Sequence, residues 1–286
     1  MINVLVTGAN GQLASSIKDL ESQYGNLNFI YTDYVELDIT DKNAIKAFFN
    51  NFPNINYCIN CAAYTAVDRA EEERELAKKI NSIGAKNLAE ICKNENTTII
   101  HISTDFVFEG TNAKAYKEND LAKPISVYGS TKLDGEHHVA KISPKYFILR
   151  TSWLYSEHGK NFMKTMLSLA KDREELDIVA DQIGTPTYAT DLASVIFKIV
   201  TTNNTDYGIY HYSNEGVASW YDFAKAIFEI SNTKIKVCAI TTEAYPTPAK
   251  RPHFSILDKT KIKNILNIDV PYWRDSLKIA ISKYNE

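Results

Sequence analysis

The sequence contains few cysteines, no long apolar run and almost no excess of charge. Four cysteines among 286 residues are too few for a disulfide framework, which favours a protein of the reducing cytoplasm. No apolar run approaches the roughly 18 residues that span a bilayer, and no basic segment of a signal peptide precedes the apolar N-terminal stretch. With 32 basic and 35 acidic residues, the chain has no overall attraction for nucleic acid or an anionic membrane. Any anionic ligand must therefore be bound by local features.

The composition is that of an ordinary globular protein. Hydrophobic residues make up 44% and charged residues 23% of the chain, which argues against disorder, coiled coil and collagen-like structure. The length corresponds to about two domains of typical size. We therefore expect one large domain or two unequal ones.

Short β-branched runs alternate with helical patterns through the first half of the chain. Strands are expected at residues 2–7, 29–32, 57–61, 98–103 and 146–151, and helices near 12–21, 42–50, 76–93 and 128–140. Strands that are apolar on both faces and joined by helices are typical of a parallel sheet covered on both sides. The pattern predicts an α/β fold with a doubly wound, Rossmann-like parallel sheet.

The regularity changes after residue 150. A helix near 191–201 and a strand near 208–212 repeat the pattern of the first half, whereas the segments around them are shorter and rich in turns. We expect a dinucleotide-binding domain of residues 1–152 and 188–213. Residues 153–187 and 214–286 then form a second, smaller and discontinuous α/β domain for the substrate.

A glycine turn follows the first expected strand and opens the first expected helix. Gly8 permits the tight turn, and Gly11 lets the backbone approach a pyrophosphate held by the helix N-terminus. Ala14 still allows the helix to pack closely on the strand. The alternative is a βα turn that binds no ligand, but this position after an apolar strand favours a dinucleotide site.

Asp33 ends the second expected strand, where an acidic side chain can bind the ribose hydroxyls of a cofactor and repel a 2′-phosphate. No lysine or arginine lies between Lys18 and Lys42 to neutralise such a phosphate. The sequence therefore leans toward NADH over NADPH. Asp33 can equally be read as a surface turn residue.

Tyr128 and Lys132 stand four residues apart on a predicted helix and hence on one face. A cation about 4 Å from the phenol, at an effective dielectric near 20, would lower its pKa by about three. We therefore expect Lys132 to make Tyr128 a competent proton donor. Thr104, at the end of the fourth strand, can polarise a substrate carbonyl beside the phenol. A surface helix pair and a turn-capping threonine are the alternatives.

Longer motifs around these residues carry a family resemblance. Beside the glycine turn they are residues 37–41 (LDITD), 60–68 (NCAAYTAVD), 103–110 (STDFVFEG), 128–132 (YGSTK), 150–155 (RTSWLY), 181–187 (DQIGTPT) and 251–252 (RP). In combination, from residue 1 to about residue 280, the chain resembles the dTDP-4-dehydrorhamnose reductase family. This family is an extended-type branch of the short-chain dehydrogenases/reductases.

The resemblance assigns expected roles to individual residues. It implies catalysis by Thr104, Tyr128 and Lys132. Besides Gly8, Gly11 and Asp33, the expected cofactor contacts include Tyr128 and Lys132 and, by the resemblance, Asn10, Gln12, Leu13, Asp38, Ile39, Ala62, Ala63 and Tyr64. The nucleotide sugar would meet Thr104 together with Thr65, Val67, Asp105, Trp153 and Arg251, the last at its diphosphate.

Four positions depart from the family pattern. Ala14 stands where the family usually has glycine, Cys61 where alanine is common, Phe106 where tyrosine is usual and Glu109 where aspartate is usual. Phe106 lacks a hydroxyl near the substrate, so this departure bears on substrate fit.

The resemblance implies reduction of dTDP-4-dehydro-L-rhamnose to dTDP-L-rhamnose. Hydride would pass from NADH or NADPH to C4 of the sugar while Tyr128 protonates O4. Two alternatives stay open: a reductase for another 4-keto-6-deoxy nucleotide sugar, and a catalytically silent regulatory subunit that binds NAD(P). A homodimer is compatible with this interpretation. No metal site is expected, because Cys58 and Cys61 would point to opposite faces of a strand.

Overall fold

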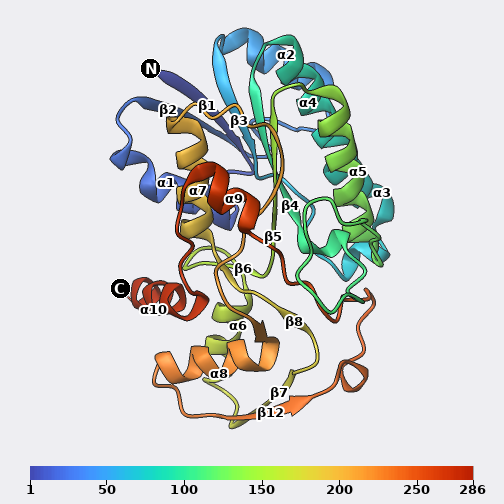
Figure 1. The fold of residues 1–286 in the computed structure, drawn as a ribbon, viewed down its shortest axis with the longest axis vertical. Helices are drawn as coiled ribbons and strands as arrows, with labels where there is room; N and C mark the ends of the chain where they lie inside the picture. The colour runs from blue at the N-terminus through green and yellow to red at the C-terminus, as the bar shows by residue number, and fades with distance from the viewer. Residues whose placement is uncertain (286) are drawn as a thin grey trace.

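A parallel sheet organises the larger part of the molecule, whose structure is a computed structural model describing residues 1–285 (Figure 1). Its six strands are β1 (Ile2–Thr7), β2 (Leu27–Thr32), β3 (Ile55–Asn60), β4 (Thr98–Thr104), β5 (Tyr146–Thr151) and β10 (Gly208–His211). They lie in the order β10-β5-β4-β3-β1-β2, and every neighbouring pair is parallel. The doubly wound sheet and the return of the chain to it near residue 208 are therefore confirmed.

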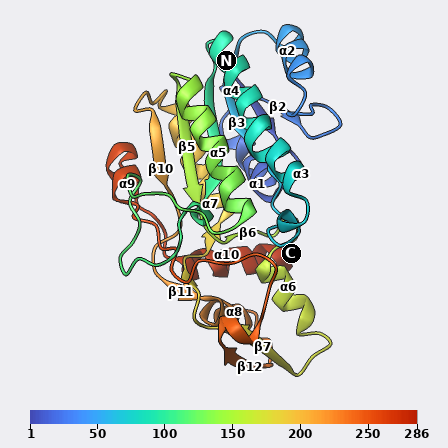
Figure 2. The same ribbon diagram turned by 90° about the vertical axis from the view of Figure 1, so that its right-hand side faces the viewer.

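Helices cover both faces of this sheet (Figures 1 and 2). Helices α1 (Gln12–Leu20) and α7 (Ala189–Thr201) lie on one face, and α2 (Lys42–Asn51), α4 (Ala85–Asn94) and α5 (Val127–Ile142) lie on the other. Successive strand residues point to opposite faces, so Val4 and Val6 pack beneath α1 and α7 whereas Leu5 packs beneath α2 and α4. Burial on both sides explains the continuous apolar strands in the sequence.

The segment expected as one helix over residues 76–93 is divided. Helix α3 (Arg74–Lys78) passes into a π-helical turn, η3 (Lys79–Gly84), before α4 begins. Turns of this kind are rare and widen a helix locally. The widened turn places Lys79 and Ile80 on the cavity described below.

A second, smaller group of elements has its own core. It contains β6 (Leu154–Tyr155), α6 (Phe162–Leu169), β7 (Glu175–Val179), β8 (Ile183–Gly184), β9 (Thr187–Tyr188), β11 (Ala218–Ser219), α8 (Trp220–Ile230), β12 (Lys236–Ile240) and α10 (Trp273–Asn285). Short strand pairs β7–β12, β8–β11 and β6–β9 frame it. Phe223, Ile227 and Leu277 are buried in this core. Helix α8 opens with a capping box between Ser219 and Asp222.

The expected division into two domains stays a prediction. Helix α9 (Thr260–Leu266), within the segment assigned to the second domain, buries Ile262 and Leu266 in the core beneath α1 and α7. Single 3₁₀ turns connect other parts of the chain, at η1 (Glu21–Gln23), η2 (Arg69–Glu71), η4 (Asp105–Val107) and η5 (Thr242–Ala244). Within residues 1–285, no helix has the length and apolar character needed to cross a membrane.

The turn at Gly8 gives a first prediction. Gly8 has φ +68°, and a Cβ atom there would lie 2.7 Å from the backbone nitrogen of Ala62. We expect Gly8→Ala to lower the free energy of unfolding by about 1–3 kcal/mol or more, because both the backbone conformation and the space are unsuitable. Gly25→Ala is the matched control, since nothing lies within 4 Å of its Cβ position. Urea denaturation measures both variants, and equal stabilities would contradict this account of the turn.

Candidate functional site

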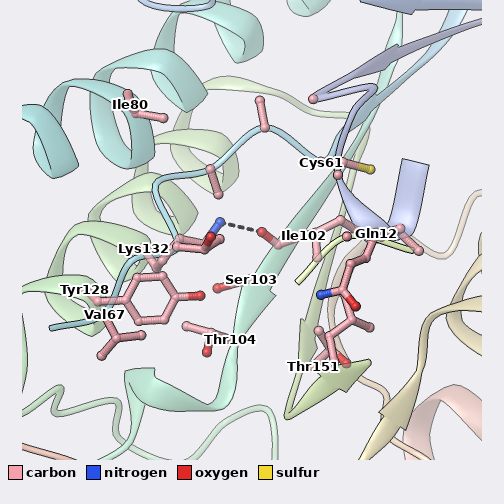
Figure 3. A pocket seen from close by; sticks show the side chains of 18 of the residues that line it. Gln12, Cys61, Val67, Ile80, Ile102, Ser103, Thr104, Tyr128, Lys132 and Thr151 are labelled. Carbon is pink, nitrogen blue, oxygen red and sulfur yellow. Dashed lines mark hydrogen bonds between the residues drawn. The ribbon is translucent and has the colours of Figure 1, made fainter. Parts of the chain in front are cut away.

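A cavity of about 910 Å³ opens at the carboxyl ends of the parallel strands. Segments that follow β1, β2, β3, β4 and β5 line it, and the smaller group of elements contributes Trp153, Lys160 and Trp220. The lining includes almost every site residue expected from the sequence: Gly8, Asn10, Gly11, Gln12, Leu13, Asp33, Asp38, Ile39, Ala62, Ala63, Thr65, Val67, Thr104, Asp105, Tyr128, Lys132, Trp153 and Arg251. Tyr64 is the exception. Figure 3 shows part of this cavity.

The glycine turn is built to receive an anion. Gly11 is the N-cap of α1, and no side chain caps the helix. The first N–H groups of α1 therefore stay available for a phosphate, which the positive end of the helix also favours. The absence of a Cβ at Gly8 allows the turn to lie against the backbone of Cys61 and Ala62. This geometry fits the diphosphate of a dinucleotide.

Asp33 both stabilises the glycine turn and lines the cavity. Its carboxylate accepts hydrogen bonds from the backbone N–H of Asn10 (2.8 Å) and of Tyr34 (2.7 Å), so it holds the glycine turn in place. The same side chain lines the cavity. An acidic group at the end of β2 can therefore shape the turn and still meet a ribose hydroxyl.

Tyr64 lies outside the cavity lining, although Ala62 and Ala63 belong to it. Its phenol donates a hydrogen bond to Glu73 (2.5 Å), and its backbone N–H donates to Asn81 (2.8 Å). Asn81 in turn donates to the carbonyl of Tyr64 (3.1 Å) and to the hydroxyl of Thr131 on α5 (3.1 Å). The buried Asn81 thus ties the segment after β3 to α5, and nothing in the sequence identified this link.

The start of α5 packs directly on the 3₁₀ turn that follows β4. Gly129 makes this contact, because a Cβ atom there would lie 2.2 Å from the carbonyl oxygen of Phe106. The rings of Phe106 and Tyr128 meet edge to face with centroids 5.6 Å apart. As a result, Tyr128, Lys132 and Thr104 converge on the cavity, as Figure 3 shows. The expected convergence of these three residues is therefore observed.

The prediction that Lys132 lowers the pKa of Tyr128 is wrong. Burial raises the pKa of Tyr128 to about 12; the nearby Thr104 hydroxyl acts in the opposite direction, and the charge of Asp105 raises the pKa further. Lys132 does not offset this effect, because its ammonium donates instead to the backbone carbonyl of Ile102 (2.6 Å). Desolvation of the phenolate outweighs the stabilisation that the i, i+4 spacing suggested.

Lys132 is itself a perturbed cation. Only 3% of the residue is exposed, and burial lowers the pKa of its ammonium to about 8. The group is therefore mostly protonated at neutral pH but close to its titration range. A buried amine of this kind in a cavity is typical of catalytic sites.

Asp105 adds a carboxylate that is only partly satisfied. Its Oδ1 accepts a hydrogen bond from the Thr104 hydroxyl (3.1 Å), while its buried Oδ2 has no partner within the described chain. Burial raises the pKa of this carboxyl group to about 6. The nearby Ser255 and Thr104 hydroxyls act on this pKa in the opposite direction.

Arg251 lines the cavity and forms an ion pair with Asp68. Its guanidinium donates two hydrogen bonds to Asp68 (3.0 and 2.7 Å) and one to the carbonyl of Ala249 (3.0 Å). Burial raises the pKa of Asp68, but hydrogen bonds from Arg251 and Ala249 outweigh this and hold it below its ordinary value. A diphosphate at Arg251 would share the cation with this carboxylate.

The smaller group of elements closes the cavity with an aromatic pair that the sequence did not reveal. The indole rings of Trp153 and Trp220 stack at 3.6 Å with an angle of 9° between them. Trp220 begins α8, about 70 positions along the chain from Trp153, so no local pattern could pair them. The two groups of elements are also joined at Gln12, whose side-chain oxygen accepts from Ser156 (3.1 Å) and Asn161 (2.9 Å).

Two clusters of potential metal ligands lie outside the cavity in residues 1–285. They consist of Asp19, Glu157 and His158, and of Glu175, Asp177 and Cys238. Cys58 and Cys61 belong to neither cluster, and they pack against opposite faces of the sheet as expected. The expectation that the site holds no metal stays a prediction.

Comparisons with known proteins agree with this geometry. A family profile described as the RmlD substrate binding domain matches residues 2–286. A dTDP-4-dehydrorhamnose reductase from Aggregatibacter actinomycetemcomitans is 46% identical over 97% of this chain and 98% of its own. The solved dTDP-4-dehydrorhamnose reductase from Clostridium acetobutylicum has a TM-score of 0.95 at 44% identity and covers both chains completely. One from Bacillus anthracis, in complex with NADP, has a TM-score of 0.94 at 41% identity and covers 99% of this chain and 100% of its own.

The position of Asp33 predicts an effect on cofactor choice. We expect Asp33→Asn to weaken NADH binding about fivefold, or about 1 kcal/mol, because a charged acceptor for the ribose is lost. NADPH binding should weaken less or improve, because repulsion of the 2′-phosphate is also lost. Fluorescence titration of both cofactors measures this ratio.

Asp41→Asn is the control for the change in charge. Asp41 caps α2 by accepting from Asn43 and Ala44 and lies outside the cavity lining, and asparagine also caps helices well. The ratio of NADPH to NADH dissociation constants should fall in Asp33→Asn only. A ratio that is the same in both variants would remove Asp33 from cofactor selection.

Proposed function

This chain belongs to the dTDP-4-dehydrorhamnose reductase family, and from that premise we propose that it reduces dTDP-4-dehydro-L-rhamnose to dTDP-L-rhamnose with NADH or NADPH. The observation that carries the proposal is the convergence of Thr104, Tyr128 and Lys132 on one cavity that also contains the glycine turn. The 910 Å³ of this cavity lie within the range of ligand-binding clefts.

The residues at the carboxyl ends of β1 to β3 would hold the cofactor. The N-terminus of α1 would bind its diphosphate, and Asp33 and Asp38 lie where its adenosine half is expected. When bound, NADH or NADPH supplies the hydride that reduces C4 of the sugar. The lean toward NADH stays a prediction, which the complex of the Bacillus anthracis relative with NADP makes worth testing.

Tyr128 would supply the proton. Its phenol keeps its hydrogen at neutral pH, because the pKa is raised to about 12, so the group is ready to donate to O4 as negative charge develops there. The Thr104 hydroxyl would bind the same oxygen and hold the carbonyl in place. After donation, the ammonium of Lys132, on the same face of α5, would have to turn from the Ile102 carbonyl toward the phenolate to stabilise it until solvent returns the proton.

The remaining expected contacts would orient the nucleotide sugar. Asp105 would bind a sugar hydroxyl through its carboxylate, and the stacked Trp153 and Trp220 form an apolar wall at the cavity. Phe106 lies beside Tyr128 without a hydroxyl of its own. Substrate fit at this point is therefore set by shape more than by hydrogen bonding.

Location and assembly are further inferences. A cytoplasmic enzyme is supported by the nucleotide cofactor and by four cysteines that are all free. A homodimer is compatible with the cavity, which one chain forms from its own residues. The silent regulatory subunit is disfavoured, because all three expected catalytic groups reach the cavity.

Turnover tests the proposal directly. We expect oxidation of NADH or NADPH in the presence of enzymatically prepared dTDP-4-dehydro-L-rhamnose, followed by absorbance at 340 nm. Chromatography of the nucleotide sugars identifies the product and separates this reaction from that of a reductase for another 4-keto-6-deoxy sugar. No turnover, under conditions in which the Aggregatibacter relative is active, would refute the substrate assignment.

Tyr128→Phe tests the proton donor. We expect kcat to fall by about 10²–10⁴-fold, while cofactor binding changes little. Tyr57→Phe is the control, because this buried tyrosine donates to Asn203 (2.9 Å) and lies outside the cavity lining. Full activity of Tyr128→Phe would disprove the proposed mechanism without affecting the substrate assignment.

A further inference from the structure

A buried ion pair lies one helical turn beyond Lys132. Glu136 follows Lys132 by four residues on α5, so Tyr128, Lys132 and Glu136 share one face of the helix. Glu136 is 2% exposed, and its partner Arg150, near the end of β5, is 3% exposed. Neither residue lines the cavity, and the reaction proposed above uses neither.

Both carboxylate oxygens of Glu136 are fully engaged. Arg150 donates from Nε (2.9 and 3.1 Å) and from Nη2 (2.7 Å), and the hydroxyl of Ser103 donates to Oε1 (2.5 Å). These charge-assisted hydrogen bonds fix the carboxylate in position. Glu136 is therefore a rigidly held carboxylate behind the cavity.

Ser103 links this anion to the catalytic end of β4. Its neighbours in the strand are Ile102, whose carbonyl accepts from the Lys132 ammonium (2.6 Å), and Thr104, expected at the substrate carbonyl. Figure 3 shows Lys132 directed to Ile102, with Ser103 and Thr104 beside it. The Glu136 carboxylate thus fixes the end of β4, the segment that contacts the Lys132 ammonium and is expected to contact the substrate carbonyl.

The titratable groups that face Lys132 belong to α5, to the segment after β3 and to β4. On α5, Glu136 favours the ammonium, whereas the neutral phenol of Tyr128 adds no charge. The Cys61 thiol, after β3, has a pKa raised by burial to about 12 and is neutral. On β4, His101 is also neutral, because burial and then Lys132 itself lower its pKa.

We propose that Glu136 is a positioning residue for the reaction proposed above. Its carboxylate keeps Lys132 protonated in a buried site and, through Ser103, holds the end of β4 against α5. Arg150 holds the Glu136 carboxylate in place. The inference rests on the proposed function, since only a turnover that needs a cationic Lys132 gives Glu136 this role.

The consequence is a defined dependence on pH. Burial lowers the pKa of Lys132 to about 8, and the charge of Glu136 opposes this effect. Without that charge the pKa falls further, so Lys132 loses its proton at lower pH. A fall from about 8 to about 7 would reduce the protonated fraction at pH 8 from about one half to about one tenth. Activity at pH 8 would then drop about fivefold from this cause alone.

Glu136→Gln is the test, with the pH profile of kcat/KM as the measurement. We expect the alkaline limb to move to lower pH relative to wild type. Glu118→Gln is the matched control: Glu118 also lies in the Arg150 cluster, accepting from Arg150 (3.4 Å) through its backbone carbonyl and from the His211 N–H (3.2 Å) through its carboxylate. The alkaline limb of the Glu118→Gln profile should lie at the same pH as that of wild type. A Glu136→Gln enzyme that loses activity equally at every pH would overturn the proposal.

A second measurement needs no turnover and therefore separates this inference from the proposed function. The free proteins are pulse-labelled with acetic anhydride at a series of pH values, and mass spectrometry quantifies acetylation at Lys132. We expect the midpoint of labelling to be lower in Glu136→Gln than in wild type. Identical midpoints would overturn the proposal even if the enzyme proves to act on another sugar.

Glu136→Asp serves if the glutamine variant does not fold. Aspartate keeps the partner charge for Arg150 but draws it back from Lys132 by one methylene group. The alkaline limb and the labelling midpoint should both move to lower pH. Both shifts should be smaller than those expected for Glu136→Gln, which removes the charge. An unchanged limb and midpoint in a folded aspartate variant would again refute the role of Glu136.

Discussion

The parallel direction of every strand in the main sheet is the constraint on which the site depends. Because the strands run the same way, their carboxyl ends meet at one edge, where the turn at Gly8, the segment at Ala62 and the end of β4 at Thr104 come together. Residues almost a hundred positions apart in the chain therefore line one cavity. Helices on both faces bury the sheet and keep this edge rigid.

Burial controls the chemistry at that edge more than the spacing of residues along α5 does. The phenol of Tyr128, the ammonium of Lys132 and the carboxyl group of Asp105 all have pKa values shifted toward their neutral forms by desolvation. Burial thus keeps the proton on the Tyr128 phenol but favours loss of the proton from the Lys132 ammonium. The protonation of Lys132 also depends on nearby charged groups. The Glu136–Arg150 ion pair, between α5 and β5, supplies them.

The sequence predicted the limits of helices and strands well where a local pattern sets them. It predicted them less well where contacts between distant segments set them. The strands of the main sheet begin and end within a few residues of their expected limits, because apolar runs between turns leave few alternatives. The helix expected over residues 76–93 is instead divided by a π-helical turn, in which Asn81 hydrogen-bonds both Tyr64 and Thr131. Helix α9 packs on the core beneath α1 and α7, because Ile262 and Leu266 contact apolar side chains there.

The sequence alone determined the fold class, the dinucleotide turn and the identity of the three catalytic candidates, because each is encoded by residues that are neighbours in the chain or one helical turn apart. Only the tertiary structure decided the proton states of Tyr128 and Lys132, the pairing of Trp153 with Trp220 and the engagement of Arg251 by Asp68. These properties depend on burial and on contacts between distant segments, and such contacts leave no periodic signal in a single sequence.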